Sequence, residues 1–135
     1  MGAKKKPNAK DAVEDTSTKE FLREYKKSCV QFETPSFKPL EKKLVEVMEE
    51  GDSKLPEILV NERIGENGAK AIANGLRMAN KGTGYNHCQA IRIWDGDIGN
   101  EGVKAFYQFI TDTNKTQIAL LEFLNCNIEA LGKYL

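Results

Sequence analysis

The stretch IRIWDGDIGNEGVKAFYQFI (residues 91–110) contains the pattern that decides the fold. Its first residues alternate in polarity, with Ile91 and Ile93 as the apolar positions, which is typical of a short strand buried on one face. After the glycine-rich middle, the apolar residues Val103, Phe106 and Ile110 follow helical spacing. The stretch therefore predicts a strand, a tight corner and an amphipathic helix.

The corner WDGDIGNEG (residues 94–102) also has the composition of a calcium loop. An EF-hand loop requires oxygen ligands at positions 1, 3 and 5, a glycine at position 6 and a glutamate at position 12. With Asp95 as position 1, Asp97 fits position 3. Gly99 at position 5 and Phe106 at position 12 offer no side-chain oxygen. The acidic residues and glycines therefore indicate a corner, and we expect no metal there.

The same pattern occurs in two further stretches, ILVNERIGENGAKAIANGL (residues 58–76) and LEFLNCNIEALGKYL (residues 121–135). Each copy has an isoleucine followed four residues later by a glycine, at positions 64 and 68, 98 and 102, and 128 and 132. The glycine is expected to permit close packing where strand and helix turn past each other. Self-similarity of this kind indicates stacked units, each of which buries the apolar side of its neighbour.

This pattern resembles the leucine-rich repeat family, in the ribonuclease-inhibitor-like subtype with one strand and one full helix in each repeat. The third copy fits every position of the family pattern, through Ile118, Leu121, Phe123, Cys126 and Ile128. In this copy the cysteine occupies the slot that the family fills with asparagine or cysteine.

The other two copies depart from the family pattern at a few positions. In the second copy Gly96 replaces the asparagine that would bond the turn. In the first copy Leu59 and Ile64 fit, but Glu57 stands where an apolar residue belongs and Glu62 holds the asparagine slot. The resemblance implies an α/β fold, a short leucine-rich-repeat solenoid of parallel strands with one helix per repeat, over residues 54–135 as two full repeats and one truncated repeat.

Residues 17–53 precede the repeats and predict two amphipathic helices, separated by the proline-containing segment QFETPSFKP (residues 31–39). Ser17 and Glu20 have the spacing of a capping box at the start of the first helix. We expect these helices to form an N-terminal cap that shields the first repeat; a separate docking hairpin is the alternative. The apolar stripes consist of Phe21, Leu22, Tyr25 and Cys29, and of Leu40, Leu44, Val47 and Met48.

The first 16 residues form a polar, lysine-led tail that is expected to be disordered. The run from Lys4 to Lys6 suits an acidic protein surface, and a purely solubilising tail is the alternative. Because Asp11, Glu14 and Asp15 lie close to these lysines, the tail makes a poor nucleic-acid footprint, and we expect no nucleic-acid partner.

The composition of the 135 residues, with 20 basic and 20 acidic side chains and 40% hydrophobic residues, is that of a one-domain soluble chain. It contains no apolar run of roughly 20 residues and no secretory signal, so a cytoplasmic protein without membrane contact is expected. Cys29, Cys88 and Cys126 are expected to be buried free thiols. His87 is the only histidine, and zinc needs four ligands, so we expect neither a metal nor a cofactor.

Two surfaces of the expected solenoid are candidate binding sites for protein partners. The concave face presents the only tryptophan between charged residues, a composition typical of interaction hot spots, although the indole packing over a neighbouring strand is the alternative. The C-terminal end carries apolar residues of an unfinished layer, each worth about 1.5–3 kcal/mol when buried, so either a partner covers them or the chain is part of a longer protein. The concave set is Val60, Asn61, Arg92, Trp94, Asp95, Glu122, Leu124 and Asn125, and the open end is Leu121, Phe123, Ile128 and Leu131.

These features favour a non-enzymatic interaction or scaffold module within a larger intracellular assembly. The sequence contains no acid–base pair, nucleophile motif or nucleotide loop, so an enzyme is not expected. Subunits of the ciliary axoneme are among the proteins that the repeat pattern resembles, which implies a cytoskeletal or ciliary location. The same resemblance gives the alternative function, regulation of a small GTPase in the manner of a GTPase-activating protein.

Overall fold

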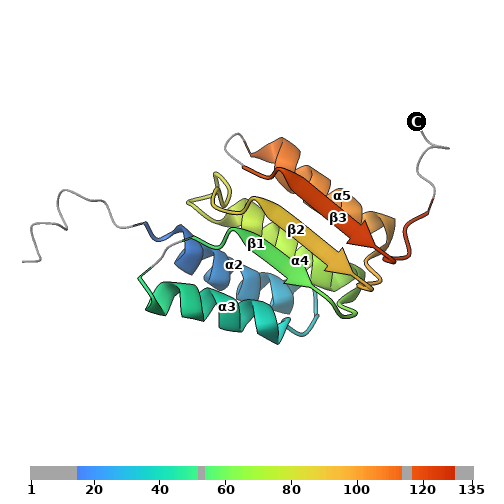
Figure 1. The fold of residues 1–135 in the computed structure, drawn as a ribbon, viewed down its shortest axis with the longest axis horizontal. Helices are drawn as coiled ribbons and strands as arrows, with labels where there is room; N and C mark the ends of the chain where they lie inside the picture. The colour runs from blue at the N-terminus through green and yellow to red at the C-terminus, as the bar shows by residue number, and fades with distance from the viewer. Residues whose placement is uncertain (1–14, 52–53, 114–116, 130–135) are drawn as a thin grey trace, which may run out of the picture.

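The computed structural model describes residues 15–51, 54–113 and 117–129. In this part of the chain, four helices and three strands follow one another as α2 (Ser17–Gln31), α3 (Lys38–Glu49), β1 (Glu57–Val60), α4 (Gly65–Met78), β2 (Ala90–Trp94), α5 (Gly99–Asp112) and β3 (Leu120–Leu124) (Figure 1). The strands form a parallel sheet in the order β1-β2-β3. The predicted α/β class with parallel strands is confirmed. The lysines of the tail and Leu131 lie outside the described residues.

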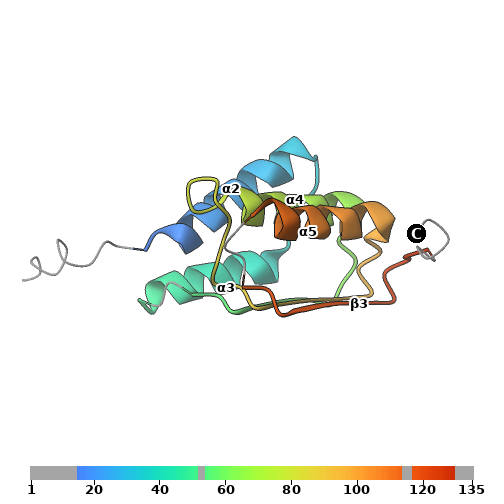
Figure 2. The same ribbon diagram turned by 90° about the horizontal axis from the view of Figure 1, so that it is seen from above.

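The sheet forms one layer and helices α2, α4 and α5 form the other, while α3 lies close to the level of the sheet (Figure 2). Helices α4 and α5 cover one face of the sheet, and α5 packs against α4. Helix α2 packs against α4 on its other side, and α3 lies beside the edge formed by β1. No helix or strand that the structure describes covers the second face of the sheet. Among the same residues, no helix combines the length and apolar character needed to cross a bilayer.

The two N-terminal helices bury the stripes that the sequence predicts, since Phe21, Tyr25, Leu40 and Leu44 are almost wholly buried. At the start of α2, however, the expected capping pair does not form. Both helices contribute to the same core as the strands, so the segment 17–51 packs as part of one folded unit.

The capping box predicted at Ser17 and Glu20 is wrong. Ser17 is already the first helical residue, and its hydroxyl and backbone N–H both donate to Asp15. The Glu20 carboxylate accepts hydrogen bonds from the Thr16 hydroxyl at 2.9 Å and from the backbone N–H of Lys81 at 2.7 Å. Those two bonds lower the pKa of Glu20, the Lys81 bond most. Glu20 therefore ties α2 to the loop after α4 instead of closing its own helix.

The predicted orientation of β1 is also wrong, because Val60 is fully buried and Leu59 is 44% exposed. Val60 pairs with Ile93 and shares its inward direction. From Val60 the chain reaches Ile64 in four residues, whereas Ile93 is five residues from the equivalent Ile98. An alignment on the isoleucines therefore sets β1 one residue out of phase, and a shift of one residue exchanges the two faces of a strand.

The corners after β2 and β3 share an unusual backbone conformation. Asp95 and Asn125 have φ values of 56° and 53°, and Asp97 and Asn127 have values of 54° and 60°. Aspartate and asparagine tolerate this left-handed region better than other residues with a Cβ, because their short side chains can bond locally. The acidic composition of residues 94–102 is thus explained by the corner that the sequence predicts.

Glycines at the start of α4 and α5 permit the close approach predicted for them. A Cβ at Gly68 would lie 2.8 Å from the Cβ of Ile64, and one at Gly102 would lie 2.7 Å from the Cβ of Ile98. The two units therefore use the same glycine–isoleucine contact. The third pair falls on residue 132 and lies outside the described residues.

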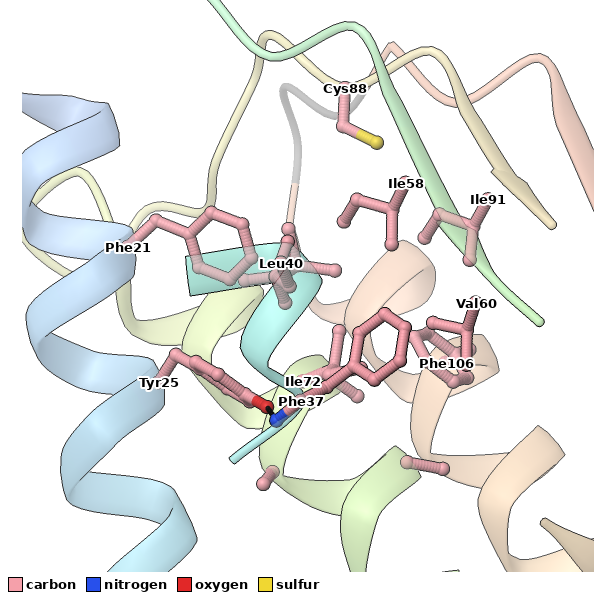
Figure 3. Close-up of a cluster of buried hydrophobic side chains, with 14 of the residues drawn as sticks. Phe21, Tyr25, Phe37, Leu40, Ile58, Val60, Ile72, Cys88, Ile91 and Phe106 are labelled. Carbon is pink, nitrogen blue, oxygen red and sulfur yellow. Dashed lines mark hydrogen bonds between the residues drawn. The ribbon is translucent and has the colours of Figure 1, made fainter. Parts of the chain in front are cut away.

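A buried hydrogen bond joins Tyr25 and Phe37 in the core beside the N-terminal helices (Figure 3). The Tyr25 hydroxyl accepts a hydrogen bond from the backbone N–H of Phe37 at 2.6 Å, across the connection between α2 and α3. Both side chains are at least nine-tenths buried, and burial raises the pKa of Tyr25 well above its usual value. The bond fixes the chain where α3 begins, because Phe37 is the N-cap residue of that helix.

Tyr25→Phe should lower the free energy of unfolding by about 1–3 kcal/mol, since it leaves a buried N–H without this acceptor. The aromatic ring is retained, so little packing is lost. Urea denaturation followed by circular dichroism measures the change. Tyr107→Phe, which removes a hydroxyl from a side chain that is 65% exposed, is the matched control and should change stability by less than about 0.5 kcal/mol. Equal effects of the two changes would contradict the role of this bond.

Candidate functional site

The uncovered face of the sheet, here called the open sheet face, gathers the most distinctive surface residues. Side chains alternate along each strand, and the inward residues Ile91 and Ile93 of β2 are fully buried against the helices. The residues between them therefore point away from the helices. The open sheet face consists of Glu57 and Leu59 from β1, Arg92 and Trp94 from β2, and Leu120, Glu122 and Leu124 from β3.

A row of alternating charge crosses the three strands of this face. The Arg92 guanidinium donates from Nε to Glu57 Oε2 at 2.7 Å and from Nη1 to Glu122 Oε1 at 3.2 Å. The Trp94 indole N–H donates to the same Glu122 oxygen at 2.9 Å. Hydrogen bonds from Trp94 and from Arg92 lower the pKa of Glu122, and those to Glu57 and Glu122 raise the pKa of Arg92. Both groups stay charged near neutral pH, and the indole is held in one orientation.

Apolar side chains lie on both sides of this charged row. Leu59 is 44% exposed, Leu120 is 36% exposed and Leu124 is 51% exposed. Leu124 lies directly across from Trp94 in the β2–β3 register. An exposed apolar area around fixed Trp and Arg side chains has the composition of a protein interface rather than that of an ordinary solvated sheet.

A groove extends the open sheet face past β1. It lies between α3 and β1, encloses about 490 Å³, and is lined on the α3 side by Leu40 and Val47 and on the β1 side by Leu55 and Leu59. Lys43 and Glu50 lie at its polar rim. The groove joins the open sheet face through Leu59, so the two form one continuous surface.

Of the turn residues predicted for this surface, Asp95 and Asn125 contact each other. Asn125 donates to Asp95 at 2.6 Å, which joins the corners after β2 and β3. Asn61 is exposed after β1. Arg63, which the sequence did not single out, forms an ion pair with Asp97 at 2.8 Å. The corners therefore carry a polar border along one end of the open sheet face.

Four of the eight predicted concave residues, Arg92, Trp94, Glu122 and Leu124, lie on the open sheet face, which also includes Leu120, and Asn61, Asp95 and Asn125 lie at the corners that border it. Val60 does not belong to this surface, because its side chain points into the core and is fully buried. Glu57 and Leu59 take its place, as the correct phase of β1 requires. The signal that could have identified them is the apolar pair Ile58 and Val60, which alternate in the same way as the inward residues of β2.

The predicted open end lies at β3 and is only partly covered. Leu121 and Phe123 are half-buried and point towards the helix layer, and Phe123 packs on Phe106 with ring centroids 5.8 Å apart. Ile128 is 37% exposed beyond the strand. Tyr107, which follows Phe106 in α5, is 65% exposed. The end of the sheet therefore presents apolar groups that solvent reaches.

The adjacent His87 and Cys88 do not form a reactive pair. His87 Nε2 lies 2.6 Å from the Asp15 carboxylate, whereas the Cys88 thiol is fully buried and donates to the carbonyl of Ala90 at 3.4 Å. Burial raises the pKa of Cys88 to about 12, so the thiol stays protonated. Cys29 and Cys126 are buried and free as well, as predicted. Within the described ranges, no group of three or more His, Cys, Asp or Glu side chains is arranged to hold a metal ion.

Comparison of the sequence with protein-family models and with curated proteins gave no match.

Proposed function

We propose that the chain is a non-enzymatic protein-binding module that engages its partner through the open sheet face. The observation that carries this proposal is the Trp94 side chain, which is held by Glu122 and flanked by exposed leucines. A tryptophan that is already fixed loses little conformational freedom when a partner covers it. The charged row provides specificity, because a wrong partner would leave Arg92 or Glu122 desolvated without compensation.

We also propose that the two βα units and β3 are leucine-rich repeats stacked as a short solenoid, with α2 and α3 as the cap. Three features support this proposal: the glycine–isoleucine contacts of the first two units, the left-handed corners after β2 and β3, and the parallel register of the three strands. The buried Cys126 thiol supports it further, since it donates to the Ile93 carbonyl of the preceding unit at 3.2 Å. That bond is the role expected of the asparagine or cysteine slot of the repeat.

The module is proposed to act inside the cell, as part of a cytoskeletal assembly such as the ciliary axoneme. This placement rests on the resemblance to repeat-containing axonemal subunits. It predicts that the purified chain co-sediments with isolated axonemal microtubule doublets and remains bound at moderate salt. A chain that stays in the supernatant at low salt would contradict the axonemal placement but not the binding role of the face.

The binding role is tested by differential capture. Wild-type protein, Trp94→Ala and Leu59→Ser serve as baits for extracts of ciliated cells, and Val30→Ser is the control because Val30 is 79% exposed on α2, outside this face. A true partner should be recovered at least about tenfold less with either face variant, since hot-spot truncation typically costs 2 kcal/mol or more. Recovery with Val30→Ser should match wild type.

Circular dichroism of each bait verifies that the variants are folded before recovery is compared. If every captured protein is recovered equally by wild type and by both face variants, the open sheet face is not the binding site. If the face-dependent partner is a small GTPase whose hydrolysis rate rises in the presence of the chain, the regulatory alternative replaces the scaffold role.

A further inference from the structure

Strand β3 has a free edge whose backbone groups can be assigned from its pairing with β2. Leu120 donates its N–H to the Gln89 carbonyl at 3.2 Å, and the Asp95 N–H donates to the Leu124 carbonyl at 2.9 Å. In a parallel strand, alternate residues direct their N–H and C=O to the same neighbour. The backbone groups of Leu121 and Phe123 therefore point to the opposite edge, where no described strand pairs with them.

Within the described residues, this edge carries neither of the two residue types, proline and lysine, that commonly protect an edge strand, and Glu122 is its single charged residue. The strand reads LLEFL, and both of its faces are mainly apolar. The inward side chains Leu121 and Phe123 are only half-buried, and Leu120 and Leu124 are exposed on the other face. An apolar edge strand with free N–H and C=O groups is a template for the addition of another strand.

The charge on β3 specifies the chemistry of the strand that would be added. Glu122 uses its Oε1 atom for both Arg92 and Trp94, and its Oε2 atom accepts no hydrogen bond from the rest of the described chain. The row across the sheet runs from Glu57 through Arg92 to Glu122, alternating in sign. Opposite charges on directly facing residues stabilise a strand pair, and like charges destabilise it. A cation therefore fits the next position in the row.

We propose that the free edge of β3 binds an extended segment of a partner protein in parallel, with a lysine or arginine opposite Glu122 and an apolar residue on each side of that cation. The chain itself places this sequence on the other side of Glu122, as Ile91, Arg92 and Ile93 of β2. A second copy is disfavoured, because its β3 carries a glutamate and no cation. This inference rests on the proposed protein-binding role; it shares Glu122 with the open sheet face, but the added strand pairs with the free edge of β3.

The test uses the full chain and a fluorescent peptide with the sequence QAIRIWD, which copies residues 89–95. The control peptide, QAIEIWD, carries Glu in place of Arg92. Fluorescence anisotropy should give at least about tenfold tighter binding of the arginine peptide. The protein variant Glu122→Lys should reverse this preference, since the charge of the facing residue is then reversed.

Two protein variants separate backbone pairing from side-chain contact. Leu121→Ala and Leu121→Pro both truncate the half-buried side chain, but only proline also removes the N–H at the free edge. We expect Leu121→Pro to raise the dissociation constant of the arginine peptide at least about tenfold more than Leu121→Ala does. Leu59→Ser, on the distant strand β1, should leave peptide binding unchanged even though it impairs the open sheet face.

Failure of this inference can be told apart from failure of the proposed function. Absence of binding, equal binding of the two peptides, or equal binding by Leu121→Ala and Leu121→Pro would overturn the edge proposal and leave the open sheet face untouched. Loss of peptide binding in Leu59→Ser would also overturn it. Dimerisation in analytical ultracentrifugation that Leu121→Pro abolishes would show that a second copy is the occupant, and the proposal of a basic partner segment would be wrong.

Discussion

Gly75→Ala is expected to lower the free energy of unfolding by about 1–3 kcal/mol, although alanine is the better helix former. Gly75 lies in α4 where this helix crosses α2. A Cβ there would lie 2.9 Å from the Cα of Tyr25, and 3.1 Å from both its Cβ and its backbone nitrogen. The obstacle is the backbone of another helix, so a side-chain rotation cannot relieve the overlap. The two helices must move apart, which loosens the packing around Tyr25.

The intrinsic gain from alanine works against this loss. In an exposed helix interior, replacing glycine by alanine stabilises a protein by about 1 kcal/mol. At Gly75 the overlap with α2 should outweigh that gain, because over-packed interiors lose density over several neighbouring side chains. The sign of the change is therefore a direct test of how closely α2 and α4 approach.

Urea denaturation of Gly75→Ala measures the change, and Asn67→Ala is the matched control. Asn67 is an exposed residue of the same helix, so its replacement should alter stability by no more than about 0.5 kcal/mol. A Gly75→Ala protein as stable as wild type, or more stable, would contradict the close helix crossing. In that case the contacts between the N-terminal helices and the sheet would also need revision.

The glycines show which parts of the packing the sequence could predict. Gly68 and Gly102 recur at the same distance from an isoleucine, so their role follows from comparing the chain with itself. Gly75 has no such counterpart, because position 109 in the second unit is Phe109. Its role depends on α2, which has no counterpart among the three similar stretches of sequence and whose crossing point is set by tertiary packing. Contacts within repeated units were therefore predictable, and contacts between unlike elements were not.

The residues of the candidate site, too, could be predicted from the sequence only in part. The adjacency of Trp94, Glu122 and Leu124 follows from a repeat of 30 residues with no change in strand phase between the second and third units. The first unit has one residue fewer between strand and helix, so its phase could not be read from the aligned isoleucines. The alignment therefore assigns Val60 to the wrong face and leaves Glu57 out of the concave set, although Glu57 completes the ion row through Arg92.

Phe106→Ala is expected to have the largest effect of all, a loss of about 3–5 kcal/mol in the free energy of unfolding. Phe106 is fully buried in α5 and packs on Phe123 with ring centroids 5.8 Å apart. Removing the ring deletes this contact and leaves a cavity between the helix layer and β3. Small domains are stable by only about 5–15 kcal/mol, so the variant should be close to unfolding at physiological temperature.

The neighbouring residue provides a matched control for this change. Tyr107→Ala removes a ring of similar size from the same helix, but the side chain is 65% exposed and its loss should cost less than about 0.5 kcal/mol. Thermal melting should therefore show a large decrease in Tm for Phe106→Ala and a negligible change in Tm for Tyr107→Ala. Similar shifts would mean that α5 does not turn its Phe106 side towards the sheet. Phe123 would then lack its support, and β3 could not present the ordered edge on which strand addition depends.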